Sequence, residues 1–227
     1  MYSHMDFNHT EWVYLSPVLD KDSPAYGGKK SIQIESAKDF HCLNHGGTHI
    51  DAPKHFFDRA TSIDQHPASF WIFENPLLLD CPKEPNSQIT IEDVKGLLYA
   101  EVSCLLIRTG FEKHRQTPLY WEENPGLDPE LGLWLRENYP SIRMIGVDVI
   151  SASAWKNREL GREAHKAFLD PEGKGNPVLI LEDMLLSSVK SNVRLHKMVV
   201  LPLRILGADG TPCTIVGNVQ KLEKPGA

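Results

Sequence analysis

The sequence has few cysteines, and their spacing argues against a structural zinc site and against a redox motif. Its four cysteines, Cys42, Cys81, Cys104 and Cys213, occur singly, without the C-x-x-C spacing of a structural zinc site or a redox motif. We therefore expect free thiols. Cys42 lies near a group of histidines and is conceivable as a ligand or a nucleophile, but a small packed residue is the favoured interpretation.

Clustered basic residues and long apolar runs are also missing. The net charge is -6 and no cluster of Lys or Arg stands out, which argues against nucleic acid or an anionic membrane as a partner. No run approaches the roughly 20 apolar residues that span a bilayer. The first residues, MYSHMDFNHTEWV, lack the layout of a signal peptide. We predict no nucleic-acid or membrane partner and a cytoplasmic location.

The composition is that of a folded protein, with 41% hydrophobic and 24% charged residues in 227. This length suits a single domain over residues 1–227. Three helices are predicted, one running from the capping box at Thr90 to Leu98, and the others over 129–138 and 158–169. Short apolar segments predict strands at 12–15, 31–35, 76–79, 102–108, 144–150, 178–181 and 198–206. This pattern indicates an α/β fold with a large mixed sheet.

A dense group of histidines carries the chemistry. His41, His45, His49 and His55 lie in the same short stretch as Asp51, which reads HGGTHIDAPKHF from His45 onward. Its two glycines and its proline argue against a helix, so we expect a loop that enters a strand. In an extended segment His49 and Asp51 point to the same side, and the glycine turn can bring His45 back beside them.

Imidazole and carboxylate donors of this kind suit zinc, manganese or ferrous iron. Zinc is the first choice, because three protein ligands leave a position for water, whose pKa a catalytic zinc lowers to about 7. The alternative is that these histidines satisfy hydrogen bonds in a loop or hold a metal for stability alone. Thr48 either braces a ligand through its hydroxyl or is simply a strand residue.

The sequence resembles the cyclase-like family that includes the bacterial kynurenine formamidases and isatin hydrolase. The family signature His-x-Gly-Thr-His-x-Asp-x-Pro-x-His stands here as HGGTHIDAPKH. The similarity continues through LSPVLDKDSPAYGG, LLIRTGF, NPGLDPELGLWL, IGVDVISAS, ILEDMLL and LPLRILGADGTPC. It implies a swivelling β/β/α single domain, a homodimer or homotetramer, and a site for one or two divalent ions.

The resemblance also implies roles for individual residues. His45, His49 and Asp51 would bind the first ion, and Asp51 would bridge to a second ion completed by His165 and Glu182. Without the resemblance, His165 would be only an exposed helical histidine, whereas Glu182 stands out as a carboxylate that ends an apolar run. His55 would be a proton shuttle, because imidazole can accept a proton and return it near neutral pH.

Several other segments lie outside the predicted ligand set. Tyr26-Gly27-Gly28 and Phe56-Phe57 are the predicted pocket walls. The formamidases carry a tryptophan near position 26, so N-formylkynurenine is not predicted as the substrate. The polar loop 170–177 is expected to alter the pocket or an oligomer contact. Arg108 and Asp148 stay outside the predicted site, the first pairing with a carboxylate across the sheet and the second capping the Ser151 turn.

The predicted function is a metal-dependent hydrolase of small amides, cyclic amides or lactones. Metal-bound hydroxide would attack the carbonyl, and His55 would protonate the leaving group. One alternative is a lyase or cyclase that uses His55 as a base and the metal as a Lewis acid. The other is a non-catalytic metal-binding protein of the same fold. Elimination would create a double bond that absorbs in the ultraviolet, whereas hydrolysis adds water.

Overall fold

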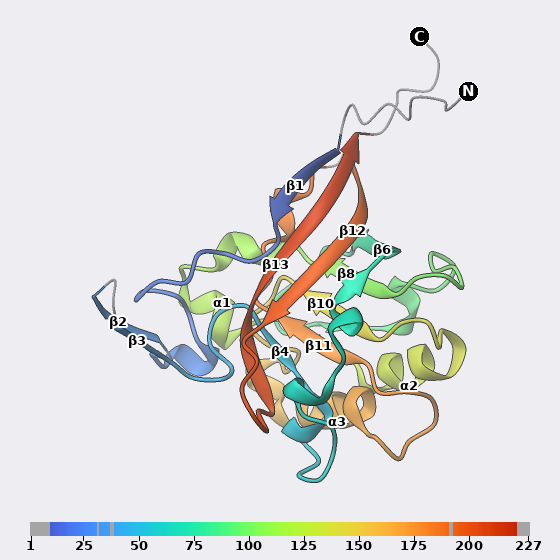
Figure 1. The fold of residues 1–227 in the computed structure, drawn as a ribbon, viewed down its shortest axis with the longest axis horizontal. Helices are drawn as coiled ribbons and strands as arrows, with labels where there is room; N and C mark the ends of the chain where they lie inside the picture. Colours follow the sequence, from blue (N-terminus) through green and yellow to red (C-terminus); the bar gives the residue numbers. More distant parts are fainter. Residues whose placement is uncertain (1–9, 31, 37–38, 191–192, 222–227) are drawn as a thin grey trace.

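The computed structural model describes residues 10–30, 32–36, 39–190 and 193–221, and one large mixed sheet runs through it (Figure 1). Its strands follow the order β5-β12-β13-β4-β11-β10-β8-β6, and β1 pairs with β13. The strands are β1 (Thr10–Tyr14), β4 (His49–Asp51), β5 (Ile72–Phe73), β6 (Pro76–Asp80), β8 (Cys104–Arg108), β10 (Met144–Val147), β11 (Leu179–Glu182), β12 (Val193–Pro202) and β13 (Gly210–Lys221). Two small sheets pair β2 (Ile32–Ser36) with β3 (Asp39–Cys42), and β7 (Gln88–Ile89) with β9 (Gly126–Leu127).

The central strands are apolar on both faces because both faces are covered. On β8, Leu105 and Ile107 pack into one core cluster with residues of the helices α2 (Pro129–Asn138) and α3 (Arg158–Leu169). Cys104 and Leu106 face the opposite way, into a second cluster with residues of β12 and β13. Alternation along buried strands produces this arrangement. The central strands therefore form a middle layer, with β12 and β13 on one side and the helices on the other, which confirms the predicted mixed α/β fold.

The longest strand, β13, was not predicted. Its first residues, Gly210 to Pro212, pair with β4, and the chain then pairs with β12 from Cys213 onward. Pro212 and Gly217 weaken the sequence pattern of a strand, which explains the omission. The predicted strand 198–206 ends at Pro202, and β12 begins earlier, at Val193. Because β13 pairs with both β4 and β12, it brings the end of β4, at Asp51, beside the loop that precedes Gly210.

The three predicted helices had different outcomes. Helices α2 and α3 have the predicted bounds, and the described part of the chain contains one further short helix, α1 (Pro118–Glu122). The capping box at Thr90 is present, since Asp93 accepts from the Thr90 backbone N–H at 2.7 Å. Only a 3-10 turn, Ile91–Asp93, follows it. The helix predicted to Leu98 is wrong, because Gly96 has a φ of +80° that a right-handed helix cannot continue.

Loop 170–177 folds back onto α2 around a buried arginine. Arg136 is 2% exposed and donates to the carbonyl oxygens of Ala167 and Asp170, both at 2.6 Å, and of Gly175 at 3.2 Å. A cation among the last carbonyls of a helix complements the helix dipole, so Arg136 stabilises the C-terminal end of α3. The loop's effect on an oligomer contact stays a prediction.

The two residues set aside as structural have structural contacts. Arg108 donates to Asp80 on the adjacent strand at 2.5 and 2.9 Å, which confirms its pairing across the sheet. The prediction that Asp148 caps the Ser151 turn is wrong. Asp148 accepts instead from the backbone N–H groups of Thr109 and Gly110, because β8 and β10 end side by side. None of the helices in the described ranges is long and apolar enough to cross a bilayer, and a cytoplasmic location stays a prediction.

Candidate metal centre

The HGGTHID segment forms a glycine turn that leads into β4. Gly47 has a φ of +63°, which favours glycine, and the turn brings His45 back so that its Nδ1 lies 2.8 Å from Asp51 Oδ1. His49 and Asp51 point to the same side of β4, with His49 Nε2 3.7 Å from Asp51 Oδ1. Each of the three offers a ligand atom, and these atoms lie within 4.8 Å of one another. The predicted loop, strand and convergence are all present.

Two further predicted residues, far away in the sequence, complete a second group around the same carboxylate. Glu182 ends β11, which pairs antiparallel with β4 and places Glu182 opposite His49. His165 on α3 has its Nε2 3.4 Å from both Asp51 Oδ2 and Glu182 Oε1. His165 is 4% exposed, so an exposed helical histidine, the alternative considered from the sequence alone, is wrong. Asp51 thus belongs to two groups of potential ligands.

The hydrogen bonds of this centre leave suitable atoms for a cation. His49 Nδ1 donates to the carbonyl of Gly47 at 2.8 Å, and His165 Nδ1 donates to that of Gly161 at 2.7 Å. A carbonyl only accepts, so each ring donates from Nδ1 and keeps Nε2 for a ligand role. Glu182 Oε1 is oriented by the backbone N–H of Ala152 at 2.6 Å. The donor set fits a divalent ion.

Electrostatics support the same conclusion. Burial alone would lower the pKa of His165, but hydrogen bonds to Asp51 and Glu182 raise it to about 10. Burial and Asp51 would raise the pKa of Glu182, but His165 and His49 hold it at about 2. Burial would also lower the pKa of His45, yet the charge of Asp51 and the hydrogen bond to Asp209 raise it to about 10. Two buried carboxylates are therefore balanced by protons that a divalent cation can replace.

The sequence of this chain is similar to known proteins over most of its length. The family described as putative cyclase matches residues 13–154. This chain belongs to that family. It is 37% identical over 108 residues to an uncharacterized protein of Haemophilus influenzae, covering 46% of this chain and 76% of that protein. It is 27% identical over 215 residues to a kynurenine formamidase of Geobacillus thermodenitrificans, covering 88% and 94%.

The fold of this cyclase-family chain is also found in a solved structure. Isatin hydrolase A from Labrenzia aggregata, bound to benzyl benzoate, superposes with a TM-score of 0.77 at 23% identity. The match covers 93% of this chain and 94% of that one. The likeness in fold extends over both strand layers and the helices, which agrees with the β/β/α arrangement predicted from the resemblance.

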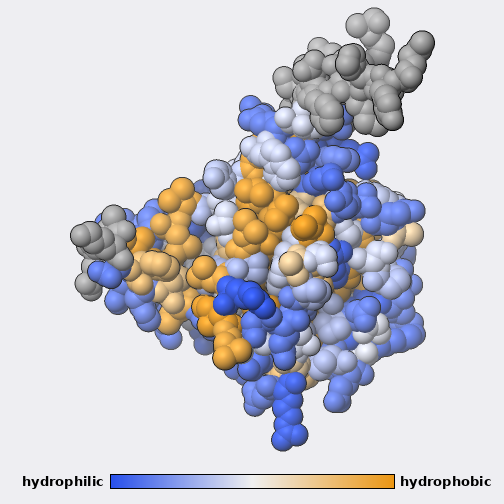
Figure 2. Space-filling view, in the orientation of Figure 1, coloured by the Kyte–Doolittle hydropathy of each residue, from blue (hydrophilic) through white to orange (hydrophobic). Residues whose placement is uncertain are grey.

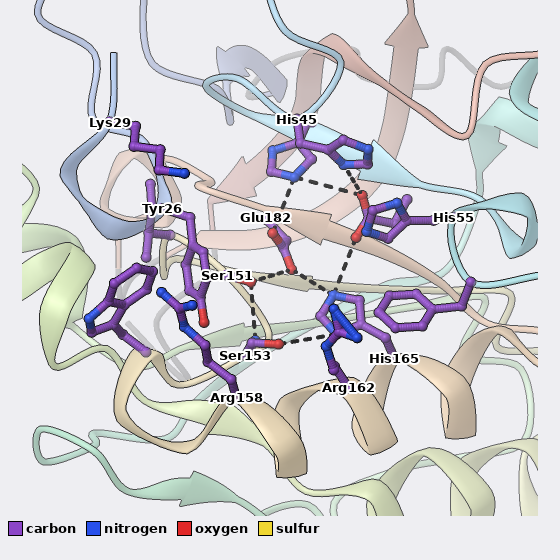
Figure 3. A pocket seen from close by; sticks show the side chains of 15 residues that line it. Tyr26, Lys29, His45, His55, Ser151, Ser153, Arg158, Arg162, His165 and Glu182 are labelled. Carbon is purple, nitrogen blue, oxygen red and sulfur yellow. Dashed lines mark hydrogen bonds and ion pairs between the residues drawn. The ribbon is translucent and has the colours of Figure 1, made fainter. Parts of the chain in front are cut away.

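The candidate metal centre of this cyclase-family protein lies in a cavity of about 460 Å³ (Figure 3). Tyr26 and Phe56 line it as predicted, whereas Gly27, Gly28 and Phe57 are not among its lining residues. Residues 170–177 do not line it either, so the expected effect of that loop on the pocket is wrong. The lining residues are Tyr26, Lys29, His45, His49, Asp51, His55, Phe56, Ile150, Ser151, Ser153, Trp155, Arg158, Arg162, His165 and Glu182.

His55 lies beside the candidate ligands and is held by a residue that sequence analysis missed. It ends the 3-10 turn Pro53–His55, and its Nδ1 lies 2.9 Å from Asp209 Oδ2. The same oxygen lies 3.1 Å from His45 Nε2. Asp209 belongs to LPLRILGADGTPC, a segment quoted for the resemblance, and an aspartate in a turn before a strand was the available signal. A third potential ligand group is His45, His55 and Asp209.

Two remaining expectations concern Thr48 and the cysteines. The Thr48 hydroxyl donates to the carbonyl of Asp183 at 2.5 Å, so it joins the start of β4 to the end of β11, and the hydrogen bonds of the described residues include none from this hydroxyl to a candidate ligand. All four cysteines are free, as predicted. Cys42 is half-buried and its thiol points to the carbonyl of Leu43 at 3.2 Å, outside the candidate ligand groups found in the described residues. Burial raises the pKa of the Cys42 thiol, which does not favour a nucleophile.

Proposed function

We propose that this chain is a metal-dependent hydrolase of small amides, cyclic amides or lactones. The observation that carries the proposal is the position of Asp51, which is shared by two groups of potential ligands in the wall of a cavity. The relatives named above as formamidase and isatin hydrolase support the class of reaction. Their low identity to this chain leaves the substrate itself as part of the proposal.

We propose Zn²⁺ as the ion, in one or two copies, with Mn²⁺ as the alternative. His45, His49 and Asp51 would hold one ion, and Asp51, His165 and Glu182 would hold the other. A bound ion of this kind lowers the pKa of water to about 7 and polarises a carbonyl. A substrate in this cavity would contact the lining residues on one face, and exclusion of water from that face would strengthen these electrostatic effects.

His55 would transfer the proton. Because the Asp209 carboxylate only accepts, His55 donates to it from Nδ1, and its Nε2 is left to take a proton from the attacking water. The same nitrogen would return the proton to the leaving amine or alcohol. Asp209 would fix the orientation and the tautomer of the His55 ring, as carboxylates beside catalytic histidines do.

Asp209→Asn tests this arrangement. We expect kcat for formanilide to fall by about 10-fold to 100-fold, because the amide no longer holds the His55 ring with its proton on Nδ1. The matched control is Asp64→Asn. Asp64 accepts at 2.8 Å from the backbone N–H of Gly207, which lies in the same loop as Asp209, and among the described residues it has no hydrogen bond to a histidine of the centre. Unchanged kcat in Asp209→Asn, measured alongside metal content, would contradict the proposed role.

The proposed function itself is tested on the wild-type chain purified without chelator. Mass spectrometry measures metal per chain, and formanilide, isatin and a lactone are offered as substrates. Hydrolysis of any of them with bound metal supports the proposal. A product with a new ultraviolet-absorbing double bond points to the lyase alternative. A folded, metal-free chain that stays inert after addition of zinc or manganese points to the non-catalytic alternative.

We also propose that the chain is a homodimer or homotetramer. Exposed apolar side chains gather over β13 and toward the β2–β3 hairpin (Figure 2). Ile34, Phe40, Leu201 and Leu203 are each at least 38% exposed and line one shallow groove. Apolar surface of this kind is typical of subunit interfaces. We expect Phe40→Asp to shift the mass measured by light scattering toward the monomer. Leu133→Asp on the exposed side of α2 is the control, and an unchanged mass for Phe40→Asp would contradict this interface.

A further inference from the structure

One face of α3 carries positive charge into the cavity. Arg158, Arg162 and His165 are spaced four and three residues apart, which places them on the same side of a helix, and all three line the cavity. Lys29 lines it as well, from the segment that follows the Tyr26 turn. Lys29, Arg158 and Arg162 are permanent cations, so three such charges border one cavity in a chain whose net charge is -6.

These three cations have no acidic partner in the part of the chain that the structure describes. The ion pairs of lysine and arginine found there involve other residues. The two carboxylates in the cavity, Asp51 and Glu182, are already engaged by histidines. Like charges four residues apart on a helix repel each other, so Arg158 and Arg162 disfavour the empty arrangement and favour a bound anion.

Arg158 is exposed, and its guanidinium stacks on the aromatic wall of the cavity. Its Cζ lies 3.5 Å from the centre of the Trp155 ring and 5.9 Å from that of Tyr26. A guanidinium stacked on a ring keeps its edge N–H groups free for a planar, two-oxygen acceptor. Gly27 keeps this wall tight, because a Cβ there would lie 2.2 Å from the Trp155 ring.

A buried donor points to the same place. The Tyr26 hydroxyl is buried beside Arg158, and it makes no hydrogen bond of good geometry among the described residues. Buried polar atoms are rarely left without a partner, so a ligand that accepts from this hydroxyl would satisfy it. Tyr26, Lys29 and Arg158 lie along one side of the cavity in Figure 3, and His45 and His55 lie on the other.

We propose that Lys29, Tyr26, Arg158 and Arg162 form an anion-binding subsite, and that the substrate is an aryl amide with a carboxylate remote from the bond that breaks. The inference rests on the proposed hydrolase function, which places that bond at the histidine centre. The aryl ring would lie between the two ends of the cavity, where Trp155 and Phe56 supply apolar walls. The carboxylate would accept from the guanidinium edges and from the Tyr26 hydroxyl.

Binding of two products that differ only in charge tests the subsite without turnover. Calorimetry compares 4-aminobenzoate with the neutral 4-aminobenzamide. We expect wild type to bind the acid at least about tenfold more tightly, and the double variant Arg158→Gln, Arg162→Gln to lose that preference. Lys166→Gln, an exposed cation on the same helix outside the cavity, should keep it. Equal affinity in wild type, or a preference that survives in the double variant, would overturn the inference.

Turnover separates this inference from the proposed function. The ratio of kcat/KM for 4-formamidobenzoate to that for 4-formamidobenzamide should fall about tenfold in the double variant, mainly through KM. An acid preference that is lost in Asp51→Asn but kept in the arginine variant would assign the carboxylate to the metal, against the subsite. Arginine-dependent binding with no hydrolysis of either formamide would support the subsite and contradict the proposed hydrolysis.

Discussion

Replacing Asp51 by asparagine should remove bound metal and lower kcat/KM for formanilide by roughly a thousandfold or more, because both groups of potential ligands depend on this carboxylate. The amide has the same size as the carboxylate but lacks the charge that balances a divalent ion. Asp51 is 1% exposed, so asparagine also removes one of the two carboxylates that face each of His45 and His165, and only Asp209 and Glu182 remain beside them. Metal per chain by mass spectrometry and initial rates measure the effect.

The control for Asp51→Asn is Asp148→Asn. Asp148 is also fully buried, but its partners are Thr109 and Gly110, so its loss should lower stability and leave metal content near that of wild type. Thermal melting of both variants separates unfolding from loss of a ligand. Wild-type metal content and rates in Asp51→Asn would show that the ligands lie elsewhere in the chain.

His55→Gln should behave differently from the ligand variant. We expect kcat to fall by about 100-fold to 10,000-fold, the range for loss of a general acid or base, while metal content is retained. The reason is that His55 contacts Asp209 and belongs to neither of the two groups that share Asp51. The loss should be smaller for 4-nitroformanilide, because its leaving amine needs less help from a proton.

The control for His55→Gln is His41→Gln, an exposed histidine on β3 that does not line the cavity. Its rates and metal content should equal those of wild type. Metal loss in His55→Gln would identify His55 as a ligand in the third group, with His45 and Asp209. Equal losses for formanilide and its nitro derivative would argue against proton donation to the leaving group.

The first group of potential ligands was predictable from the sequence because its geometry is local. Alternation along a strand sets His49 and Asp51 on one side, and the glycine turn determines where His45 lies. The second group required the resemblance, since His165 and Glu182 reach Asp51 only through the packing of α3 and the pairing of β11 with β4. No local pattern contains that information.

Long-range contacts also explain what was missed. Asp209 is separated by more than 150 residues from both histidines that it contacts, and only the course of β13 brings it to them. The cation-lined wall was missed for a related reason. Arg158 and Arg162 belong to a correctly predicted helix, but the sequence does not say which of its faces is turned toward the cavity. The uniformly apolar strands β8, β10 and β11 were predictable because burial on both faces leaves a direct signal.

Arg136 is hydrogen-bonded to the end of α3, and this helix sets the distances between His165 and the two arginines of the subsite. A helix rises about 1.5 Å per residue, so Arg162 lies about 4.5 Å and Arg158 about 10 Å along the axis from His165. These spacings belong to the helix backbone, so they are the same whichever ligand is bound. Isomers that differ only in the position of the carboxylate on the ring would therefore place it beside Arg162 or beside Arg158. The chain would discriminate between such isomers by the distance from the carboxylate to the bond that breaks.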